Sequence, residues 1–288
     1  MTSFNTFSGG AAGRTFLVTG GNTGIGLATA TALARDGGRV YIGCRTAATG
    51  EAAVARIKAE AGSDDVFLLP LDLASLDSVQ ACAEAFLARD EPLHVLVNNA
   101  GVSGMSGLTA DGFEIHFGTN HLGHYALTQR LLPRLTASGP GARVVTVSSD
   151  GHNMPTGIDW AAVRQPTAET SGGGYEYCVS KLCNVVFSQE LARRTAGTGV
   201  QAYVLHPGVV DSDVWRKAPH LAGWASTQQL LTTADGAATS VYCATSAEVA
   251  QDSGLYYEKC AVKAPNPAAT PELAAEVWKH SAEWTGLG

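Results

Sequence analysis

Short runs of apolar, often β-branched residues alternate with longer stretches of helical periodicity along most of the chain. The apolar runs predict strands at 15–19, 39–43, 66–71, 94–98, 143–148, 200–205 and 254–258. Alanine-rich segments such as GLATATALARDG and EAAVARIKAEAG lie between strands, and each ends in a glycine that commonly stops a helix. Strands this apolar are typical of a parallel sheet covered on both faces. The pattern therefore predicts an α/β, doubly wound fold with a seven-stranded parallel sheet flanked by helices.

Three segments lack this regular pattern. The chain shows no composition break, linker or repeat, so we expect one domain over residues 1–288, with 1–13 as a flexible N-terminus. Segments 150–173 and 211–229 connect late elements and should lie over the ligand-binding end of the sheet. We expect both to be substrate loops, although 150–173 could also be a surface excursion. Trp215 and Trp224 then form an apolar lid or simply pack, in preference to a membrane-interface element.

Composition and charge exclude several classes of protein. The net charge of -7 argues against nucleic acid as a partner, because binding it normally requires a basic face. Six scattered cysteines without a CxxC pair are typical of buried thiols in a reducing compartment. The N-terminus does not read as a signal peptide, and no apolar stretch approaches the roughly 18–20 residues of a membrane-spanning helix. We therefore expect a cytoplasmic protein with no transmembrane anchor.

A glycine-rich turn follows the first predicted strand and leads into a helix. Its glycines are spaced as Gly20-xxx-Gly24-x-Gly26 rather than in the common GxGxxG pattern. Glycines there permit a tight turn and a close approach to a pyrophosphate, while the helix N-terminus supplies free N–H groups and a favourable dipole. This predicts a dinucleotide site, with a glycine-rich turn that binds nothing as the alternative.

The end of the second predicted strand bears on the choice of cofactor. An NAD enzyme would usually carry an acidic residue there to bind the ribose 2′-OH. This strand ends instead in Gly43-Cys44-Arg45. The Arg45 guanidinium could neutralise a 2′-phosphate, which favours NADP(H) over NAD(H), and a solvated surface arginine is the alternative interpretation.

The stretch GYEYCVSKLCN places two tyrosines before a lysine. On a helix, residues four apart share a face and residues six apart do not, so Tyr177 can meet Lys181 whereas Tyr175 cannot. A free tyrosine has a pKa of about 10, and a nearby ammonium should lower the pKa of Tyr177 and prepare it for proton transfer. Tyr175 is assigned to packing or to the lid.

Polar groups and sharp turns follow four further strands, where parallel strands would bring them to one edge of the sheet. An acid after the third strand could receive an adenine amine, and hydroxyls after the fifth could hold a substrate carbonyl oxygen. The segments are Leu71-Asp72-Leu73, Asn98-Asn99-Ala100-Gly101, Ser148-Ser149 and His206-Pro207-Gly208-Val209-Val210, with Thr119-Asn120-His121 on the helix after the fourth strand.

From residue 15 onwards the chain resembles the short-chain dehydrogenase/reductases, and most closely their retinol dehydrogenase branch. The likeness lies in GGNTGIGLATA, CRTAATGEAA, LDLASLDSV, TNHLGHYALT, YCVSKLCNVVFSQELARR, GTGVQAYVLHPGVV and WKHSAEWTGL. It implies a Rossmann-type fold and a catalytic tetrad of Asn120, Ser149, Tyr177 and Lys181. Tyr177 would be the general acid/base, Ser149 would hold the substrate oxygen, and Lys181 would bind the nicotinamide ribose. Asn120 would shape its helix around a water that relays protons to Lys181.

The resemblance also implies the contacts with a nicotinamide cofactor. They are Gly20, Asn22, Thr23, Gly24, Ile25, Gly26, Arg45, Asp72, Leu73, Asn99, Tyr177, Lys181 and Val210. Of the two serines, Ser149 is expected to act on the substrate and Ser148 to bond backbone. Relatives often pair through the helices that carry Asn120 and Tyr177, but monomers also occur, so the resemblance leaves a homodimer, a homotetramer and a monomer open.

Three histidines near Asn120, namely His116, His121 and His124, raise the question of a metal. They do not all share one helix face, and no nearby cysteine or paired carboxylate completes a site. We therefore predict no metal, with the histidines packed on the helix or solvated.

Together these patterns predict an NADP(H)-dependent oxidoreductase that interconverts a carbonyl and an alcohol on a lipophilic aldehyde or ketone. A pathway-specific ketoreductase of secondary metabolites or steroids is the alternative within that class. A non-catalytic NADP(H)-sensing regulator is the alternative from another class, and it has no need of Ser149, Tyr177 and Lys181 together.

Overall fold

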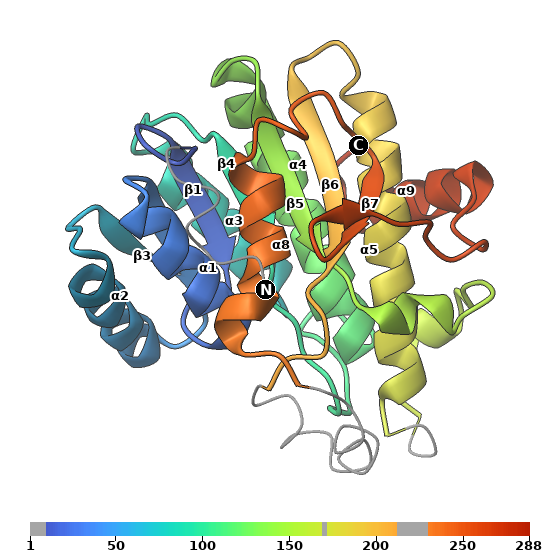
Figure 1. The fold of residues 1–288 in the computed structure, drawn as a ribbon. Coiled ribbons are helices and arrows are strands. Elements are labelled where there is room, and N and C mark those ends of the chain that lie inside the picture. Colours follow the sequence, from blue (N-terminus) through green and yellow to red (C-terminus); the bar gives the residue numbers. More distant parts are fainter. Residues whose placement is uncertain (1–9, 169–171, 212–229) are drawn as a thin grey trace.

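One sheet runs through the computed structural model, which describes residues 10–168, 172–211 and 230–288 (Figure 1). In the described residues the sheet has eight strands in the order β3-β2-β1-β4-β5-β6-β7-β8. They are β1 (Thr15–Thr19), β2 (Arg39–Cys44), β3 (Val66–Pro70), β4 (Val95–Asn98), β5 (Ala142–Val147), β6 (Val200–His206), β7 (Leu255–Glu258) and β8 (Ala261–Val262).

The first seven strands are parallel and match the seven predicted from the apolar runs to within a residue or two. The eighth was missed, so the prediction of seven strands was short by one. β8 is two residues long, too short to carry a pattern, and it pairs antiparallel with β7. Lys259 and Cys260 join the two strands with φ of 52° and 60°, the backbone of a tight hairpin turn.

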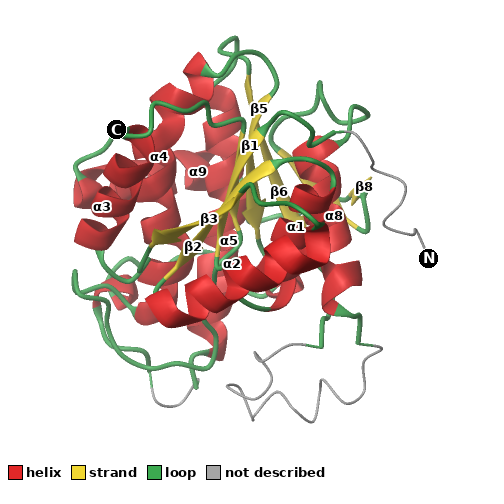
Figure 2. Ribbon diagram, turned by 90° about the vertical axis from the view of Figure 1, so that its left-hand side faces the viewer, coloured by secondary structure: helices red, strands yellow, loops and turns green. Residues whose placement is uncertain are grey.

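Helices cover both faces of the sheet (Figure 2). In the described residues they are α1 (Gly24–Arg35), α2 (Ala47–Ala61), α3 (Leu76–Leu87), α4 (Gly123–Ala137), α5 (Gly174–Arg194), α8 (Thr233–Thr245) and α9 (Pro271–Thr285). A π-helix, Phe117–Leu122, runs directly into α4, and the short 3₁₀ turns Asp150–Asn153 and Ala162–Arg164 lie between β5 and α5. No helix among the described residues combines the length and apolar character needed to cross a membrane.

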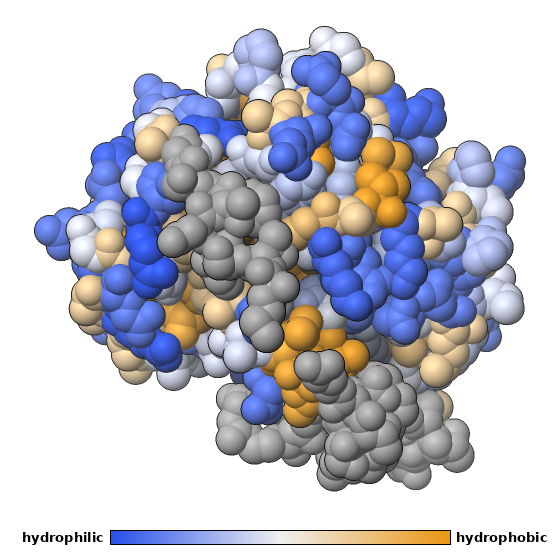
Figure 3. Space-filling view, in the orientation of Figure 1, coloured by the Kyte–Doolittle hydropathy of each residue, from blue (hydrophilic) through white to orange (hydrophobic). Residues whose placement is uncertain are grey.

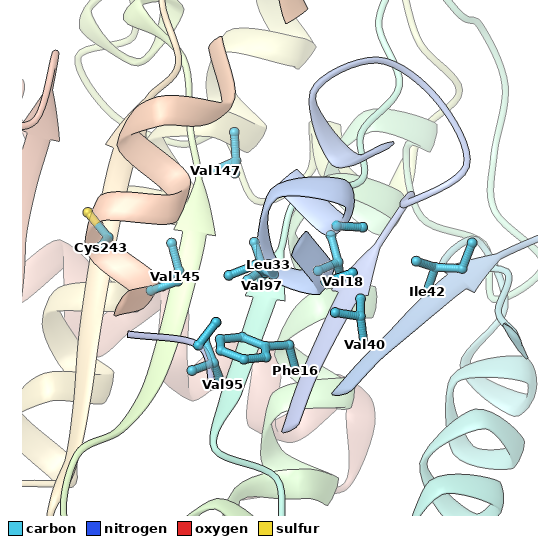
Figure 4. Close-up of a cluster of buried hydrophobic side chains, with 14 of the residues drawn as sticks. Phe16, Val18, Leu33, Val40, Ile42, Val95, Val97, Val145, Val147 and Cys243 are labelled. Carbon is cyan, nitrogen blue, oxygen red and sulfur yellow. The ribbon is translucent and has the colours of Figure 1, made fainter. Parts of the chain in front are cut away.

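Successive side chains along each strand point to opposite faces of the sheet, so the strands contribute to two hydrophobic cores, one on each face. Phe16, Val18 and Val40 point to one face and pack with α1, α2 and α8 (Figure 4). Leu17 and Tyr41, at the intervening positions, pack with α3, α4, α5 and α9 on the other face. Because both faces are buried, the strands read as continuous apolar runs, and the doubly wound prediction is confirmed.

This topology fixes where a ligand can bind. β1 lies between β2 and β4, so the strand order reverses between β1 and β4 and the connections leave in opposite directions. Such a switch point opens a crevice beyond the carboxyl ends of the strands. The first strand ends at Thr19, the fourth at Asn98 and the fifth at Val147, which brings the segments after them to one edge.

Candidate active site

The turn after β1 needs its glycines for two different reasons. Gly20 and Gly24 have φ of 66° and 56°, in the left-handed region that other residues rarely adopt. Gly26 has ordinary φ but no room, because a Cβ there would lie 2.3 Å from the Gly20 carbonyl oxygen and 2.4 Å from Asn99 Nδ2. The turn is thus folded tightly against the segment after β4.

The N-terminus of α1 is open to a ligand. Thr23 precedes the helix with an extended backbone, and its side chain does not cap the first N–H groups. A Cβ on Gly24 would meet no atom of the described residues within 4 Å, and a groove of about 460 Å³ runs from Asn22, Thr23 and Gly24 along α1 to Arg35. Uncapped N–H groups beside open space are what a pyrophosphate requires, so these residues fit a dinucleotide. Ile25 and Val210 lie together against Gly236 of α8.

The predicted cofactor contacts after β2 and β3 differ in exposure and in hydrogen bonding. Arg45 is exposed, and within the described chain it makes no hydrogen bond or ion pair, which leaves its guanidinium available to an anion. Asp72 Oδ1 accepts a hydrogen bond from Ala74 N at 3.0 Å, so this carboxylate shapes its own loop and keeps one oxygen for another donor. Leu73 is buried, and its carbonyl lies 2.5 Å from where a Cβ on Gly123 would sit, at the start of α4.

The turn after β4 is tied to the end of β1. Thr19 Oγ1 accepts from Asn99 N at 2.9 Å and from Ala100 N at 3.0 Å, while Asn99 Nδ2 donates to Thr19 O at 2.8 Å. Asn99 therefore lies under the glycine turn, beside other residues that the resemblance implies as cofactor contacts.

Tyr177 and Lys181 lie together on α5, as their spacing predicted. Lys181 Nζ is 5.5 Å from the centre of the Tyr177 ring and donates to the Val147 carbonyl at 3.0 Å. Lys181 is buried, and its two other N–H groups have no hydrogen-bond partner among the described residues. Tyr175 is 49% exposed, so it does not pack in the core, and its alternative assignment to the lid stays a prediction.

The two serines after β5 divide as expected. Ser148 is buried and its hydroxyl donates to the Lys181 carbonyl at 2.8 Å, which holds β5 against α5. Ser149 is only half-buried, accepts from Gly151 N at 3.2 Å and interacts with the Tyr177 hydroxyl. Ser149 is thus the serine that shares a site with the tyrosine.

Asn120 lies in the π-helix before α4, and its side chain is fully used. Its Oδ1 accepts from Val102 N at 2.8 Å, and its Nδ2 donates to Val102 O and Ser180 Oγ, both at 3.0 Å. A Cβ on Gly101 would lie 3.4 Å from Asn120 Oδ1 and 3.5 Å from Lys181 Nζ. The structure therefore brings all four predicted tetrad residues to one place.

The expected lowering of the tyrosine pKa is wrong for this arrangement. Burial raises the pKa of Tyr177 to about 12, and the Ser149 hydroxyl offsets only part of that rise. Burial also lowers the pKa of Lys181 to about 8. Desolvation disfavours both charged forms and outweighs the attraction that spacing alone suggested.

Comparison with known proteins decides the family. A family model described as short chain dehydrogenase matches residues 14–162. Human retinol dehydrogenase 12 is 43% identical to this chain over 279 residues, which cover 96% of the chain and 87% of that protein. The chain belongs to the short-chain dehydrogenase/reductase family.

Other relatives agree with this assignment. Dehydrogenase/reductase SDR family member 13 of Bos taurus is 40% identical over 96% of the chain and 74% of its own length. A solved structure of an uncharacterized protein from Mycobacterium paratuberculosis shares 31% identity and a TM-score of 0.80, covering 99% of this chain and 97% of that one. This short-chain dehydrogenase/reductase is thus an oxidoreductase that resembles the retinol dehydrogenases.

The three histidines of this family member bind protein groups in three directions. His116 Nδ1 lies 2.8 Å from Glu114 Oε1, and His121 Nε2 lies 2.9 Å from Ser281 Oγ. The ring of His124 bonds the end of β1 instead. All three are buried, so the alternative of solvated histidines was wrong. Among the described residues, no cluster of three or more metal-binding side chains is present.

Sequence reasoning missed two polar residues of the site. Ser180 accepts from Asn120 Nδ2 and donates to the Tyr177 carbonyl at 2.6 Å, so it joins the π-helix to α5. Glu114 is buried, and its carboxylate accepts from His116 N, Phe117 N and the Thr167 hydroxyl. The only sequence signal was position, since Ser180 directly precedes Lys181 and Glu114 stands in an otherwise apolar run. Trp215 and Trp224 lie outside the described residues.

Proposed function

We propose that the protein is an NADP(H)-dependent oxidoreductase that interconverts a carbonyl and an alcohol on a lipophilic aldehyde or ketone. The observation that carries the proposal is the meeting of Asn120, Ser149, Tyr177 and Lys181 beside the glycine turn. A half-buried serine and tyrosine next to a buried lysine provide hydrogen-bond donors for a substrate oxygen at the edge where a dinucleotide fits.

The choice of NADP(H) rests on Arg45. This exposed guanidinium follows β2, where an acidic residue would select NAD(H), and it can form a charge-assisted fork with a 2′-phosphate. Two solved relatives at 28% identity support the choice: the Pseudomonas aeruginosa RhlG/NADP complex, with a TM-score of 0.70, and a Burkholderia cenocepacia short chain dehydrogenase in complex with NADP, with a TM-score of 0.68.

The tetrad residues divide the work of proton transfer. The Ser149 hydroxyl holds the substrate oxygen beside Tyr177, whose neutral phenol donates its proton to that oxygen during reduction and takes it back during oxidation. Two free N–H groups of Lys181 would bind the nicotinamide ribose, and Asn120 keeps the π-helix beside them. A bound NADPH supplies the hydride. Burial moves the pKa of Tyr177 further above neutrality, so the neutral phenol is the form that meets the substrate oxygen.

Apolar surface near the site supports a lipophilic substrate. Four of the exposed large apolar side chains in the described chain follow strand ends or begin α5, at the ligand-binding end of the sheet. The four residues are Leu108, Met154, Tyr175 and Leu230. Figure 3 shows an apolar patch in the lower centre of that view. The relatives named retinol dehydrogenase point the same way.

The test combines cofactor titration with turnover. NADPH fluorescence should report tighter binding than NADH, and Arg45→Ala should weaken NADPH binding by roughly 10-fold or more, the value of a charged hydrogen bond, without affecting NADH. Arg89→Ala, at an exposed arginine just after α3 and outside the groove at Gly24, is the matched control. Equal NADH and NADPH binding would contradict the assignment of Arg45.

Turnover on aldehydes and ketones that include retinal and steroids then separates the substrate classes. Activity on long apolar aldehydes would support the proposal. Activity confined to one cyclic ketone would favour the pathway-specific ketoreductase, and tight NADPH binding without turnover would favour the sensor.

A further inference from the structure

His124 has no role in the tetrad, yet it contacts two parts of the site at once. It lies in the first turn of α4, is fully buried, and uses both ring nitrogens. Nδ1 is 2.9 Å from the backbone carbonyl oxygen of Asn120, and Nε2 is 2.8 Å from Thr19 Oγ1. One side chain thus joins the π-helix to the end of β1.

The partners determine where the protons lie. The carbonyl of Asn120 can only accept, so Nδ1 must carry a proton and donate it. Burial, reinforced by the Lys181 charge, holds the pKa of His124 at about 4, even though the Asn120 carbonyl favours the charged form. The ring is therefore neutral near pH 7, and Nε2 must be an acceptor.

That assignment fixes the Thr19 hydroxyl as well. Its proton goes to His124 Nε2 at 2.8 Å, in preference to the Val97 carbonyl at 3.4 Å. Its oxygen is then free to accept from both Asn99 N and Ala100 N. Every proton in this chain of bonds has one consistent place, which orders the turn under the cofactor site before any ligand binds.

We propose that His124 is a positioning residue that sets two features of the reaction independently: through Thr19, the cofactor-binding turn, and through the Asn120 carbonyl, the π-helix beside Lys181. The proposal rests on the proposed function. It predicts that the two hydrogen bonds of His124 affect different constants: the bond to Thr19 affects the Kd for NADPH, and the bond to Asn120 affects kcat.

Two variants of His124 separate its two hydrogen bonds, because the polar atoms of Asn and Gln lie at different distances from the backbone. His124→Asn keeps a donor near the position of Nδ1 and loses the bond to Thr19, so the Kd for NADPH should rise about five- to ten-fold with kcat within about two-fold. His124→Gln keeps an acceptor near the position of Nε2 and loses the bond to Asn120. Its Kd should stay within about two-fold while kcat falls roughly ten-fold.

His121 provides the matched control. It is equally buried on the same helical segment, but its Nε2 bonds Ser281 of α9, away from the glycine turn. His121→Asn and His121→Gln should lower the melting temperature without separating Kd from kcat. If the His124 variants behave as the His121 variants do, with no split between the two constants, the positioning role is refuted.

A measurement on the wild-type chain keeps the test open if the variants do not fold. Nitrogen NMR of ¹⁵N-histidine-labelled protein should show His124 as a neutral ring protonated at Nδ1 near pH 7; a proton on Nε2, or a charged ring, would overturn the inference. A wild-type chain that binds neither NADPH nor NADH would refute the proposed function itself. Wild-type binding and turnover with unresponsive His124 variants would refute only the inference.

Discussion

At the scale of single residues, chemistry in this protein depends on which of two similar side chains is buried and which is free. Ser148 is buried and bonded to backbone, whereas Ser149 faces Tyr177. Tyr177 lies over Lys181, whereas Tyr175 is 49% exposed. Adjacent or near-adjacent positions thus have different roles because strand and helix geometry sends them in different directions.

Tyr177→Phe should abolish most turnover and leave cofactor binding intact. Proton transfer by a positioned group contributes about 100-fold or more to rate, and the phenol oxygen is the only atom removed. The check is kcat together with the Kd for NADPH. Tyr175→Phe, on the exposed tyrosine two residues earlier, should change neither constant. Normal turnover by Tyr177→Phe would contradict its role as the proton donor.

At the scale of elements, the π-helix is the junction on which the site is built. Asn120 bonds the loop after β4 and Ser180 of α5. Glu114, just before the π-helix, accepts from His116 N and Phe117 N and also bonds the Thr167 hydroxyl in the segment between β5 and α5. A wide helical turn with this many external partners is common at functional sites.

Glu114→Gln should loosen that segment and destabilise the protein. Burial alone would raise the pKa of Glu114, but hydrogen bonds from His116 and Thr167 hold it below the usual value, so the native carboxylate is charged. An amide would turn an NH₂ toward donors, at a cost of about 1–3 kcal/mol in the free energy of unfolding.

Urea denaturation measures this cost, and substrate KM should rise more than cofactor KM. The control is Glu84→Gln on the exposed face of α3, where a change within about 0.5 kcal/mol is expected. Equal stability of the two variants would show that Glu114 does not anchor the segment.

At the scale of the whole molecule, α9 covers part of the surface of α4 and α5. Trp278 stacks on Phe187 of α5 at 6.0 Å and meets Tyr125 of α4 edge-on at 5.1 Å. The Tyr125 hydroxyl donates to the Leu287 carbonyl at 2.7 Å, and Arg194 lies over the Trp278 ring. The helices through which relatives often pair are therefore partly occupied by the chain's own C-terminal segment.

We accordingly predict a monomer, which is one of the states that the resemblance leaves open. Light scattering after size exclusion should give a mass near 29.8 kDa. A mass of twice that value would contradict the prediction, and loss of the larger species on mutation of exposed α4 residues would place the interface on that helix.

Two buried histidines should make the whole fold sensitive to acid. Burial lowers the pKa of His121 to about 3 and of His124 to about 4, against about 6.5 in the unfolded chain. Below about pH 6.5 the unfolded chain binds protons that the folded chain does not, so the free energy of unfolding falls as pH decreases toward about 4.

The fall contributed by each histidine is at most about 1.4 kcal/mol per pH unit. Urea denaturation at several pH values between about 7 and 5 measures it. His121→Phe should reduce the slope by the share of one histidine. An unchanged slope in this variant would show that His121 is not held neutral by burial.

Local spacing along the chain determined the strands and the central pair of the site. Alternating apolar runs predicted the parallel strands, because both faces of the sheet are buried and each strand reads as continuous hydrophobic sequence. A four-residue interval predicted the pairing of Tyr177 with Lys181, because helical geometry alone places them on one face.

Tertiary packing decided what spacing could not. β8 depends on β7 for its existence, and the proton positions of His124 depend on Thr19, 105 residues away in sequence. The raised pKa of Tyr177 likewise reflects the partial removal of water from its hydroxyl by the segments packed around it. Burial and long-range hydrogen bonds arise only when distant segments meet, so the sequence determined which groups the site contains and the tertiary structure determined their protonation and partners.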